Sequence, residues 1–407
     1  MSEQPRQPRP GRRSSTLIDP GTHGAPVFDL AGLMADRGVR IVVCCGSGGV
    51  GKTTTAAALA VHAAERGRRV VVLTIDPARR LAQSLGLTEL DNTPRAVQGI
   101  DTSAGGSLDA MMLDMKRTFD DVVSAHTKPE KAAQIFANPF YEALSSSFAG
   151  TQEYMAMEKL GQLHALTGDD GRPAWDLIVV DTPPSRSALD FLDAPSRLGS
   201  FLDGRLIKVL VAPAKAGGRV YTKVVGAGLS VASGALSKVL GTGMLEDVRG
   251  LVTAMDTMFG GFRERADVTF SLLQRPETAF VVVTSPERDA LREAGYFVDR
   301  LEADAMPLAG AVVNRVRQTR TDAISVDAAL TALPGPPPGE GQIAWSAAQE
   351  LLEVHAEVAA EARLHERLTD AFASRHPTVA LRTVPIAATD IHDLDGLRTV
   401  GAHLTGV

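Results

Sequence analysis

The chain of 407 residues contains little cysteine and no long apolar run. Its two cysteines, Cys44 and Cys45, are neighbours in an apolar stretch. Adjacent cysteines in a buried strand can build neither a disulfide framework nor a Cys-x-x-Cys zinc site, so no zinc is expected. No uninterrupted apolar run of about 18 residues occurs and the N-terminus is polar, which argues against a membrane span or a secretory signal. The composition suits a reducing cytoplasm.

An excess of positive charge is also missing. The formal net charge is −6 and the isoelectric point is about 5.9. An electrostatic nucleic-acid binder is therefore not expected. Residues 1–26 are rich in proline, arginine, serine and glycine, and predict a disordered tail whose arginines are either solvated or in contact with an acidic surface.

Glycine is concentrated just after residue 45. Residues 46–53 read G-S-G-G-V-G-K-T and match the phosphate-binding pattern G-x-x-x-x-G-K-[ST]. An apolar run of strand type, 41–45, precedes them, and the alanine-rich stretch 54–64 that follows is typical of a helix. An ordinary glycine-rich turn does not require this strand–loop–helix setting. The pattern therefore predicts a site for a nucleoside triphosphate.

The residues of this loop have distinct expected roles. Glycines let backbone N–H groups turn inward around a phosphate, and the helix N-terminus adds partial positive charge. Lys52 is expected to neutralise the β- and γ-phosphates during catalysis, and the Thr53 hydroxyl to bind Mg²⁺. The expected nucleotide contacts from the loop are Gly46, Ser47, Gly48, Gly49, Val50, Gly51, Lys52, Thr53 and Thr54.

Apolar, β-branched runs alternate with helical stretches along the chain. This pattern predicts an α/β fold, a P-loop NTPase with a mainly parallel sheet sandwiched by helices. Ligands of such sheets bind outside the carboxyl ends of the strands, where polar residues stand in this sequence. The expected strands are 41–45, 69–75, 176–180, 279–283, 308–313 and 379–384.

Two stretches, 107–166 and 196–275, interrupt the alternation with apolar residues at helical spacing, so we expect a Met-rich helical subdomain inserted into a domain of residues 27–407. Its methionines form either a core or a groove for a hydrophobic client. A long helix is expected over 343–374. Eight of the eleven methionines lie in the two insertions: Met111, Met112, Met115, Met155, Met157, Met244, Met255 and Met258.

Three polar residues follow predicted strands. Hydrolysis of a γ-phosphate needs a positioned water, Mg²⁺ and stabilisation of charge. Asp181 closes an apolar strand and is expected to hold Mg²⁺, directly or through water, while Asp76 could orient or deprotonate the attacking water. Either aspartate could instead cap a helix or a turn. Asn314 carries a donor and an acceptor on one amide, which suits the edge of a base, or is a loop asparagine.

These motifs, taken in order, resemble the ArsA/Get3 family of deviant Walker A ATPases over roughly residues 40–407, and look closest to its actinobacterial members. The resemblance implies ATP and Mg²⁺ as ligands, with Thr53 on the metal, Asp76 positioning water, Asp181 in the second switch and Asn314 on adenine. It also implies dimers whose closure around ATP reshapes the helical insertions. The motifs are 46–54, Asp76-Pro77-Ala78, Asp181-Thr182-Pro183-Pro184, Val312-Val313-Asn314-Arg315, and Pro385 with Ile391-His392-Asp393-Leu394, where Pro385 is a further expected nucleotide contact.

One departure from the family pattern concerns Ser47, which stands where these ATPases carry a signature lysine that reaches the partner's phosphates. A homodimer would then hydrolyse slowly, or a paralogous ATPase would supply the cation in a heterodimer. The arsenite enzyme's cysteine ligands are missing too. We therefore expect a cytoplasmic Mg²⁺-dependent ATPase that couples dimer closure to a hydrophobic or membrane-protein client, peripheral to a membrane through a partner. The alternative is a weakly hydrolysing regulatory or scaffold subunit paired with a paralogue.

Overall fold

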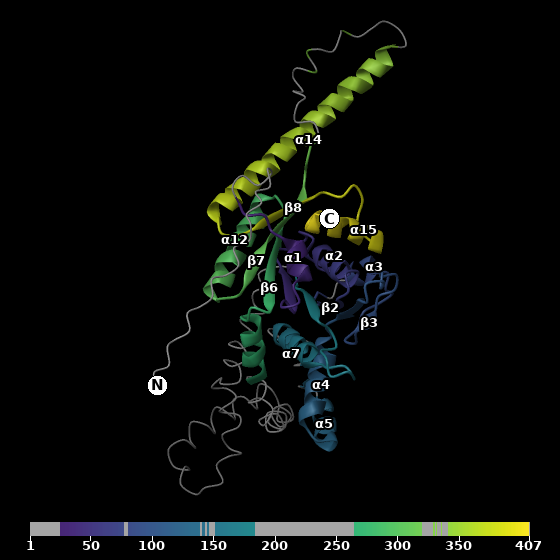
Figure 1. Cartoon of the computed structure of the whole chain (residues 1–407), viewed down its shortest axis with the longest axis vertical. Helices are drawn as coiled ribbons and strands as arrows, with labels where there is room; N and C mark the ends of the chain where they lie inside the picture. The colour runs from purple at the N-terminus through teal and green to yellow at the C-terminus, as the bar shows by residue number, and fades with distance from the viewer. Residues whose placement is uncertain are drawn as a thin grey trace, which may run out of the picture.

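A computed structural model describes residues 25–76, 80–138, 141–142, 145, 151–183, 264–319, 329, 331, 335 and 341–406. Their centre is an eight-stranded sheet in the order β3-β4-β2-β5-β1-β6-β7-β8 (Figure 1). Every neighbouring pair is parallel except β3 and β4. The predicted α/β class, with its mainly parallel sheet, is confirmed.

The central strands are apolar along their whole length because helices cover both faces of the sheet. All residues of β1, β5 and β6 are buried. Each of the six predicted strands is present, and β3 and β4 are additional. The strands are β1 Ile41–Cys45, β2 Arg69–Thr74, β3 Arg95–Ala96, β4 Ser107–Met112, β5 Leu177–Asp181, β6 Thr278–Thr284, β7 Leu308–Val316 and β8 Leu381–Pro385.

Strand β4 corrects the prediction that a helical insertion begins at residue 107. Leu108 and Ala110 pack on one face of the sheet and Met111 on the other, which is the two-residue period of a strand. The apolar residues of this stretch fit helical spacing as well, so periodicity alone misassigned it. Pairing with β2 along six residues settles the strand. Helix α4 begins only at Met115, capped by Asp114.

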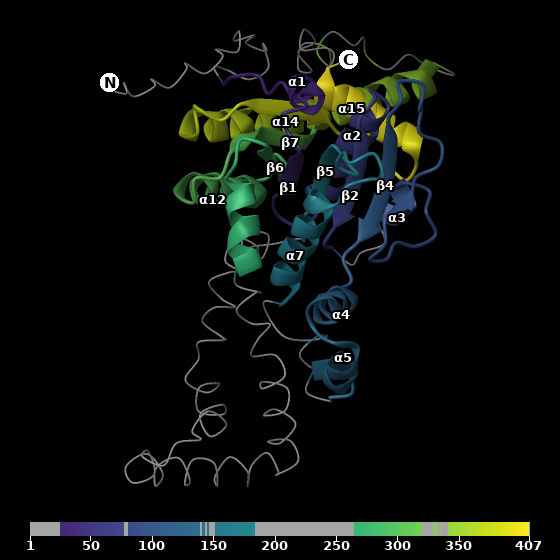
Figure 2. The ribbon, with the colours of Figure 1, turned by 60° about the horizontal axis from the view of Figure 1, so that its bottom comes forward.

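Helices cover both faces of the sheet (Figure 2). The buried residues between the sheet and these helices form one hydrophobic cluster on each face. Apolar residues of α1, α2, α3 and α15 pack on one face, and those of α4, α7, α12 and the end of α14 on the other. The helices are α1 Leu30–Ala35, α2 Lys52–Ala64, α3 Arg80–Ser84, α4 Met115–His126, α5 Pro129–Phe136, α7 Thr151–Ala165, α12 Arg288–Ala303, α14 Gly341–Arg375 and α15 Leu394–Thr405.

The predicted tail and insertions are described only in part. Residues 1–24 and 184–263 lie outside the described residues, and with them most of the second insertion. Ala25 is buried and the Pro26 carbonyl accepts a hydrogen bond from Leu381 N, so these last two residues of the predicted tail pack against the domain. In the first insertion, α4, α5 and α7 follow β4, and Met155 and Met157 are fully buried core residues.

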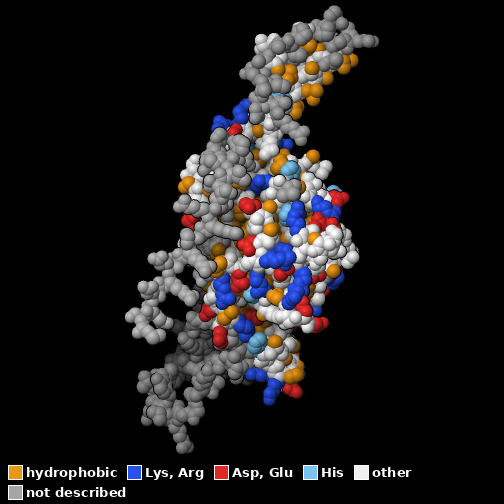
Figure 3. All heavy atoms as spheres, viewed as in Figure 1, with side chains coloured by type: hydrophobic (Ala, Val, Ile, Leu, Met, Phe, Trp, Pro, Cys, Tyr) orange, Lys and Arg blue, Asp and Glu red, His pale blue; other side chains and the backbone are white. Residues whose placement is uncertain are grey.

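Helix α14 confirms the long helix predicted over 343–374. Its C-terminal end packs beside α12, whereas its N-terminal half extends beyond the sheet (Figure 1). That half exposes the hydrophobic side chains of Ile343, Leu351 and Val354. Figure 3 shows hydrophobic side chains gathered on this part of the molecule. Within the described ranges, no helix combines the length and the apolar character needed to cross a membrane.

Candidate nucleotide-binding site

The glycine-rich loop joins the end of β1 to the first residue of α2. Gly46, Gly49 and Gly51 have φ angles of 150°, 79° and 97°, a region that side-chain-bearing residues rarely adopt. A Cβ atom at Gly46 would lie 2.0 Å from the Val283 carbonyl oxygen of β6. Gly48 and Gly49 are exposed at the tip of the loop. The sequence therefore builds a loop that bends tightly against the sheet and presents its tip to solvent.

Lys52 lies over this loop. Its ammonium group is buried and donates a hydrogen bond to the Ser47 carbonyl oxygen at 2.8 Å. Burial lowers the pKa of Lys52, and the nearby carboxylate of Asp181 acts in the opposite direction. The buried Ser47 hydroxyl has no hydrogen-bond partner. A bound polyphosphate would supply both a counter-charge for Lys52 and an acceptor for this hydroxyl, so these residues fit the predicted ligand.

Asp181, the last residue of β5, is fully buried beside the first turn of α2. Its Oδ2 atom accepts hydrogen bonds from Thr53 Oγ1 at 2.8 Å and from Thr74 Oγ1 at 3.0 Å, while its Oδ1 atom has no partner. Burial raises the pKa of Asp181 to about 6, against the lowering effect of the two hydroxyls and Lys52. A hydroxyl and a carboxylate with a spare buried oxygen form a donor set that could hold Mg²⁺.

Thr74 is a site residue that sequence reasoning missed. Its hydroxyl contacts Asp181 Oδ2 and also lies 3.3 Å from the backbone nitrogen of Asp76, which donates to it. Thr74 therefore links Asp181, the predicted metal ligand, to Asp76, the predicted catalytic residue, and the negative charge of Asp76 contributes to raising the pKa of Asp181. The available signal was a hydroxyl at the last position of an otherwise apolar strand, directly before the loop that carries Asp76.

Asn314 contacts the loop from β7. Its Nδ2 atom donates a hydrogen bond to the Val50 carbonyl oxygen at 2.9 Å. The pairing of β7 with β8 shifts register between Val313 and Val316, so Asn314 and Arg315 lie at an irregularity within the strand. The structure thus brings Asn314 to the phosphate-binding loop, and its predicted contact with a base stays a prediction. Val50 packs into the core and Thr54 lies in the first turn of α2.

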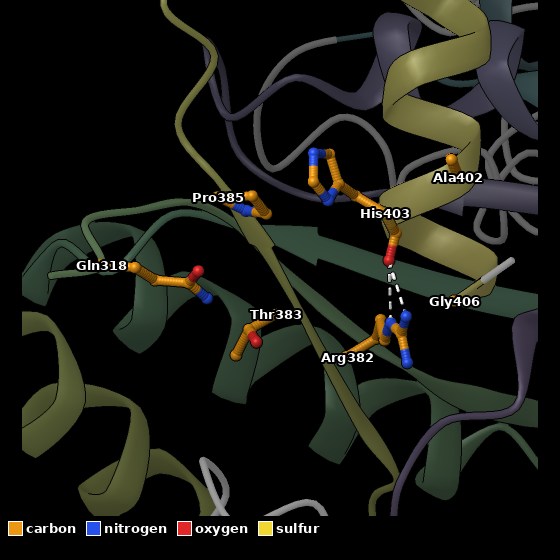
Figure 4. Close-up of a pocket in the computed structure, with 7 residues that line it drawn as sticks. All are labelled: Gln318, Arg382, Thr383, Pro385, Ala402, His403 and Gly406. Carbon is orange, nitrogen blue, oxygen red and sulfur yellow. Dashed lines mark hydrogen bonds between the residues drawn. The ribbon is translucent and has the colours of Figure 1, made fainter. Parts of the chain in front are cut away.

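Pro385 lies further along the sheet, at the end of β8. It lines a cavity of about 440 Å³ between β8 and α15, where Arg382 donates hydrogen bonds to the His403 carbonyl oxygen (Figure 4). No residue of the phosphate-binding loop lines this cavity, so the predicted nucleotide contact of Pro385 also stays a prediction. The lining residues are Gln318, Arg382, Thr383, Pro385, Ala402, His403 and Gly406.

Comparison with known proteins agrees with this geometry. The profile of the anion-transporting ATPase family, ArsA_ATPase, matches residues 39–326, which include the loop, Asp76, Asp181 and Asn314. The chain belongs to this family. The protein is accordingly an ATP hydrolase that binds nucleotide, as its sequence predicted.

Several proteins named ATPase GET3 are similar to the chain. ATPase GET3 of Podospora anserina is 28% identical over 273 residues, which are 66% of this chain and 73% of the relative. ATPase GET3 of Chaetomium globosum is 28% identical over 46% of this chain and 51% of the relative. ATPase get3 of Neurospora crassa is 26% identical over 70% and 76%, respectively. The predicted ArsA/Get3 relationship is confirmed.

Proposed function

We propose that the chain is a Mg²⁺-dependent ATPase of the Get3 type that couples ATP-driven closure of a dimer to the binding or targeting of a hydrophobic or membrane-protein client. The observation that carries the metal-dependent chemistry is the fully buried Asp181 with its unpartnered Oδ1 atom, hydrogen-bonded to Thr53 beside the buried Lys52. P-loop enzymes use groups of these types to hold the metal and the phosphates, which supports the proposal.

Each residue has a defined task in the proposed reaction. Mg²⁺ held by this site would stabilise the negative charge that develops during phosphoryl transfer to water. Thr53 and Asp181 supply its protein oxygens, and Lys52 pairs with the phosphates in place of the Ser47 carbonyl oxygen. Asp76, held near Asp181 through Thr74, orients the attacking water.

Ser47 supports the proposal that a partner completes the site. Its side chain is buried and uncharged, and its carbonyl oxygen already accepts from Lys52, so residue 47 brings no cation to a neighbouring subunit. A missing charge of this kind lowers the rate of phosphoryl transfer by orders of magnitude. The second candidate function follows from this residue: a regulatory or scaffold subunit that hydrolyses ATP slowly alone and pairs with a paralogous ATPase in a heterodimer.

Fewer methionines are available for the proposed client surface than the sequence alone suggested. Met111, Met155 and Met157 are fully buried, which supports a core role for these three. The support for a hydrophobic client comes from the family relationship and from the remaining methionines of the insertions. We place this activity in the cytoplasm, with any contact to a membrane made through a partner.

Steady-state ATP hydrolysis by the purified chain tests the proposal, with oligomeric state measured by light scattering in the same samples. Wild type is compared with Asp76→Asn and Ser47→Lys, in Mg²⁺ and in EDTA. Asp289→Asn, at an exposed carboxylate of α12, is the matched control. Mg²⁺-dependent turnover that Asp76→Asn abolishes supports a self-sufficient enzyme. Near-zero turnover that Ser47→Lys restores supports the heterodimer subunit. Turnover that is unchanged in EDTA and in Asp76→Asn contradicts both candidates.

A further inference from the structure

We propose that Asn314 is a positioning residue that braces the phosphate-binding loop from β7, and so strengthens the binding of phosphates independently of any base. This role depends on the geometry of the loop and rests on the phosphate binding proposed for that loop. It assigns to Asn314 a task separate from the predicted reading of adenine.

The backbone around Asn314 is shaped to deliver its side chain. Arg315 has a φ angle of 60°, the left-handed region that is unfavourable for a residue with a side chain. The same position interrupts the ladder between β7 and β8, because the register shifts between Val313 and Val316. Bulges of this kind re-aim a side chain at the end of a strand. Here the redirected side chain of Asn314 contacts the phosphate-binding loop.

The contact with the loop is close and specific. Asn314 Nδ2 lies 2.9 Å from the Val50 carbonyl oxygen, and a Cβ atom added to Gly51 would lie only 2.3 Å from Nδ2. Glycine is therefore needed at position 51 for two reasons: its φ angle is 97°, and the Asn314 amide occupies the space that a side chain would take. Gly51, which directly precedes α2, and the side chain of Asn314 from β7 fit against each other with no room for a larger group.

This contact fixes the direction of a loop amide. The Val50 carbonyl and the Gly51 N–H belong to one planar trans peptide and point to opposite sides of it. A hydrogen bond that holds the Val50 oxygen towards Asn314 therefore holds the Gly51 N–H away from Asn314. Backbone N–H groups of such loops are the groups that bind phosphate oxygens. Pre-orienting one of them lowers the cost of binding.

Bracing the loop and reading a base can coexist in one side chain. An asparagine amide has two N–H donors and an acceptor oxygen, and the bond to Val50 uses one donor. The second donor and the oxygen remain for a base edge. A ligand that has phosphates but no base therefore separates the two tasks.

The test is calorimetric titration of the purified chain with ATP and with inorganic tripolyphosphate, both in Mg²⁺. The variants are Asn314→Ala, which removes the amide, and Asn314→Asp, which keeps its shape but replaces the donor with a charge facing Val50. Asn92→Ala is the matched control, since Asn92 makes similar side-chain hydrogen bonds near α4. Thermal unfolding without ligand confirms that each variant is folded.

We expect Asn314→Ala to weaken tripolyphosphate binding by about 3- to 10-fold, the value of one hydrogen bond, and Asn314→Asp to weaken it further. Asn92→Ala is expected to bind as wild type does. Wild-type affinity of Asn314→Ala for tripolyphosphate, with weaker binding of ATP alone, would overturn the bracing task and leave only base reading. Failure of wild type to bind either ligand would instead overturn the proposed function, so the two failures are distinguishable.

Discussion

Thr53 Oγ1 donates a hydrogen bond of 2.8 Å to Asp181 Oδ2, which ties the first turn of α2 to the end of β5 across 128 residues of sequence. The acceptor is a carboxylate with no exposed surface, whose other oxygen has no partner. A buried, half-satisfied carboxylate costs folding free energy, so its presence is better explained by what it binds than by what it stabilises. Two predictions separate those effects.

The first prediction concerns the activity of Asp181→Asn. The amide keeps the size of the side chain but loses the charge that a divalent cation requires. We expect Mg²⁺-dependent hydrolysis to fall by about 100-fold or more, and the Mg²⁺ concentration that gives half-maximal rate to rise. Titrating the rate with Mg²⁺ measures both, with Asp289→Asn as control. An unchanged Mg²⁺ dependence would remove Asp181 from the metal site.

The second prediction concerns the stability of the same variant without metal. The pKa of Asp181 is about 6 in the folded chain, above its ordinary value of 3.8, so the folded state binds more protons than the unfolded state between these pH values. The stability that this group contributes is therefore present at low pH and lost as pH rises through about 6. Asp181→Asn removes the penalty, and we expect it to gain up to about 3 kcal/mol at pH 7.5.

Urea unfolding in EDTA at pH 7.5 and at pH 4 measures this gain. We expect the difference between wild type and Asp181→Asn to be largest at pH 7.5 and to shrink towards zero at pH 4. A variant that is less stable than wild type at pH 7.5 would show that the hydrogen bonds from Thr53 and Thr74 outweigh the cost of burying the charge.

The third prediction concerns two glycines of the loop. A Cβ atom at Gly46 would meet the backbone oxygen of Val283 at 2.0 Å, whereas one at Gly49 would meet nothing within 4 Å. Both have positive φ angles, so alanine is strained at either place. We expect Gly49→Ala to cost about 1 kcal/mol and Gly46→Ala about 3 kcal/mol or more, measured by urea unfolding without nucleotide. Equal losses of unfolding free energy would mean that the end of β6 shifts to make room for the new methyl group.

The fourth prediction concerns Thr74. Valine has the shape of threonine without the hydroxyl that contacts Asp181 and Asp76. We expect Thr74→Val to lower kcat about tenfold, as loss of a group that orients a metal ligand does, with little change in ATP affinity. Thr74→Ser, which keeps the hydroxyl, is expected to retain most of the activity. Full activity of the valine variant would contradict the linking role.

The parts of the fold and site that could be predicted are those determined by short stretches of sequence. The loop from Gly46 to Thr53 and the strands that lead to Asp76 and Asp181 were recognisable because strand, loop and helix follow one another directly. Strand β4 was missed because its apolar spacing fits a helix as well as a strand. That choice is made by hydrogen bonds to β2, which lies far away along the chain.

The contacts between distant segments could not be predicted. Asn314 was expected near the nucleotide, but its hydrogen bond to Val50 joins residues 264 positions apart. That bond depends on a local shift in the pairing of β7 with β8, and a sequence pattern does not show strand register. Thr74 was missed for a related reason, because a threonine at the end of a strand is common and only its position opposite Asp181 gives it a role.

Helix α15 belongs to the same folded unit as the phosphate-binding loop, because it covers α2. It packs along α2, with Gly401 against Ala58 and Arg398 paired with Glu65 at 2.8 Å. The family match stops at residue 326, so a fragment cut to that boundary would lose both β8 and the cover of the helix that begins at Lys52. Expression of the catalytic unit therefore needs the chain through α15.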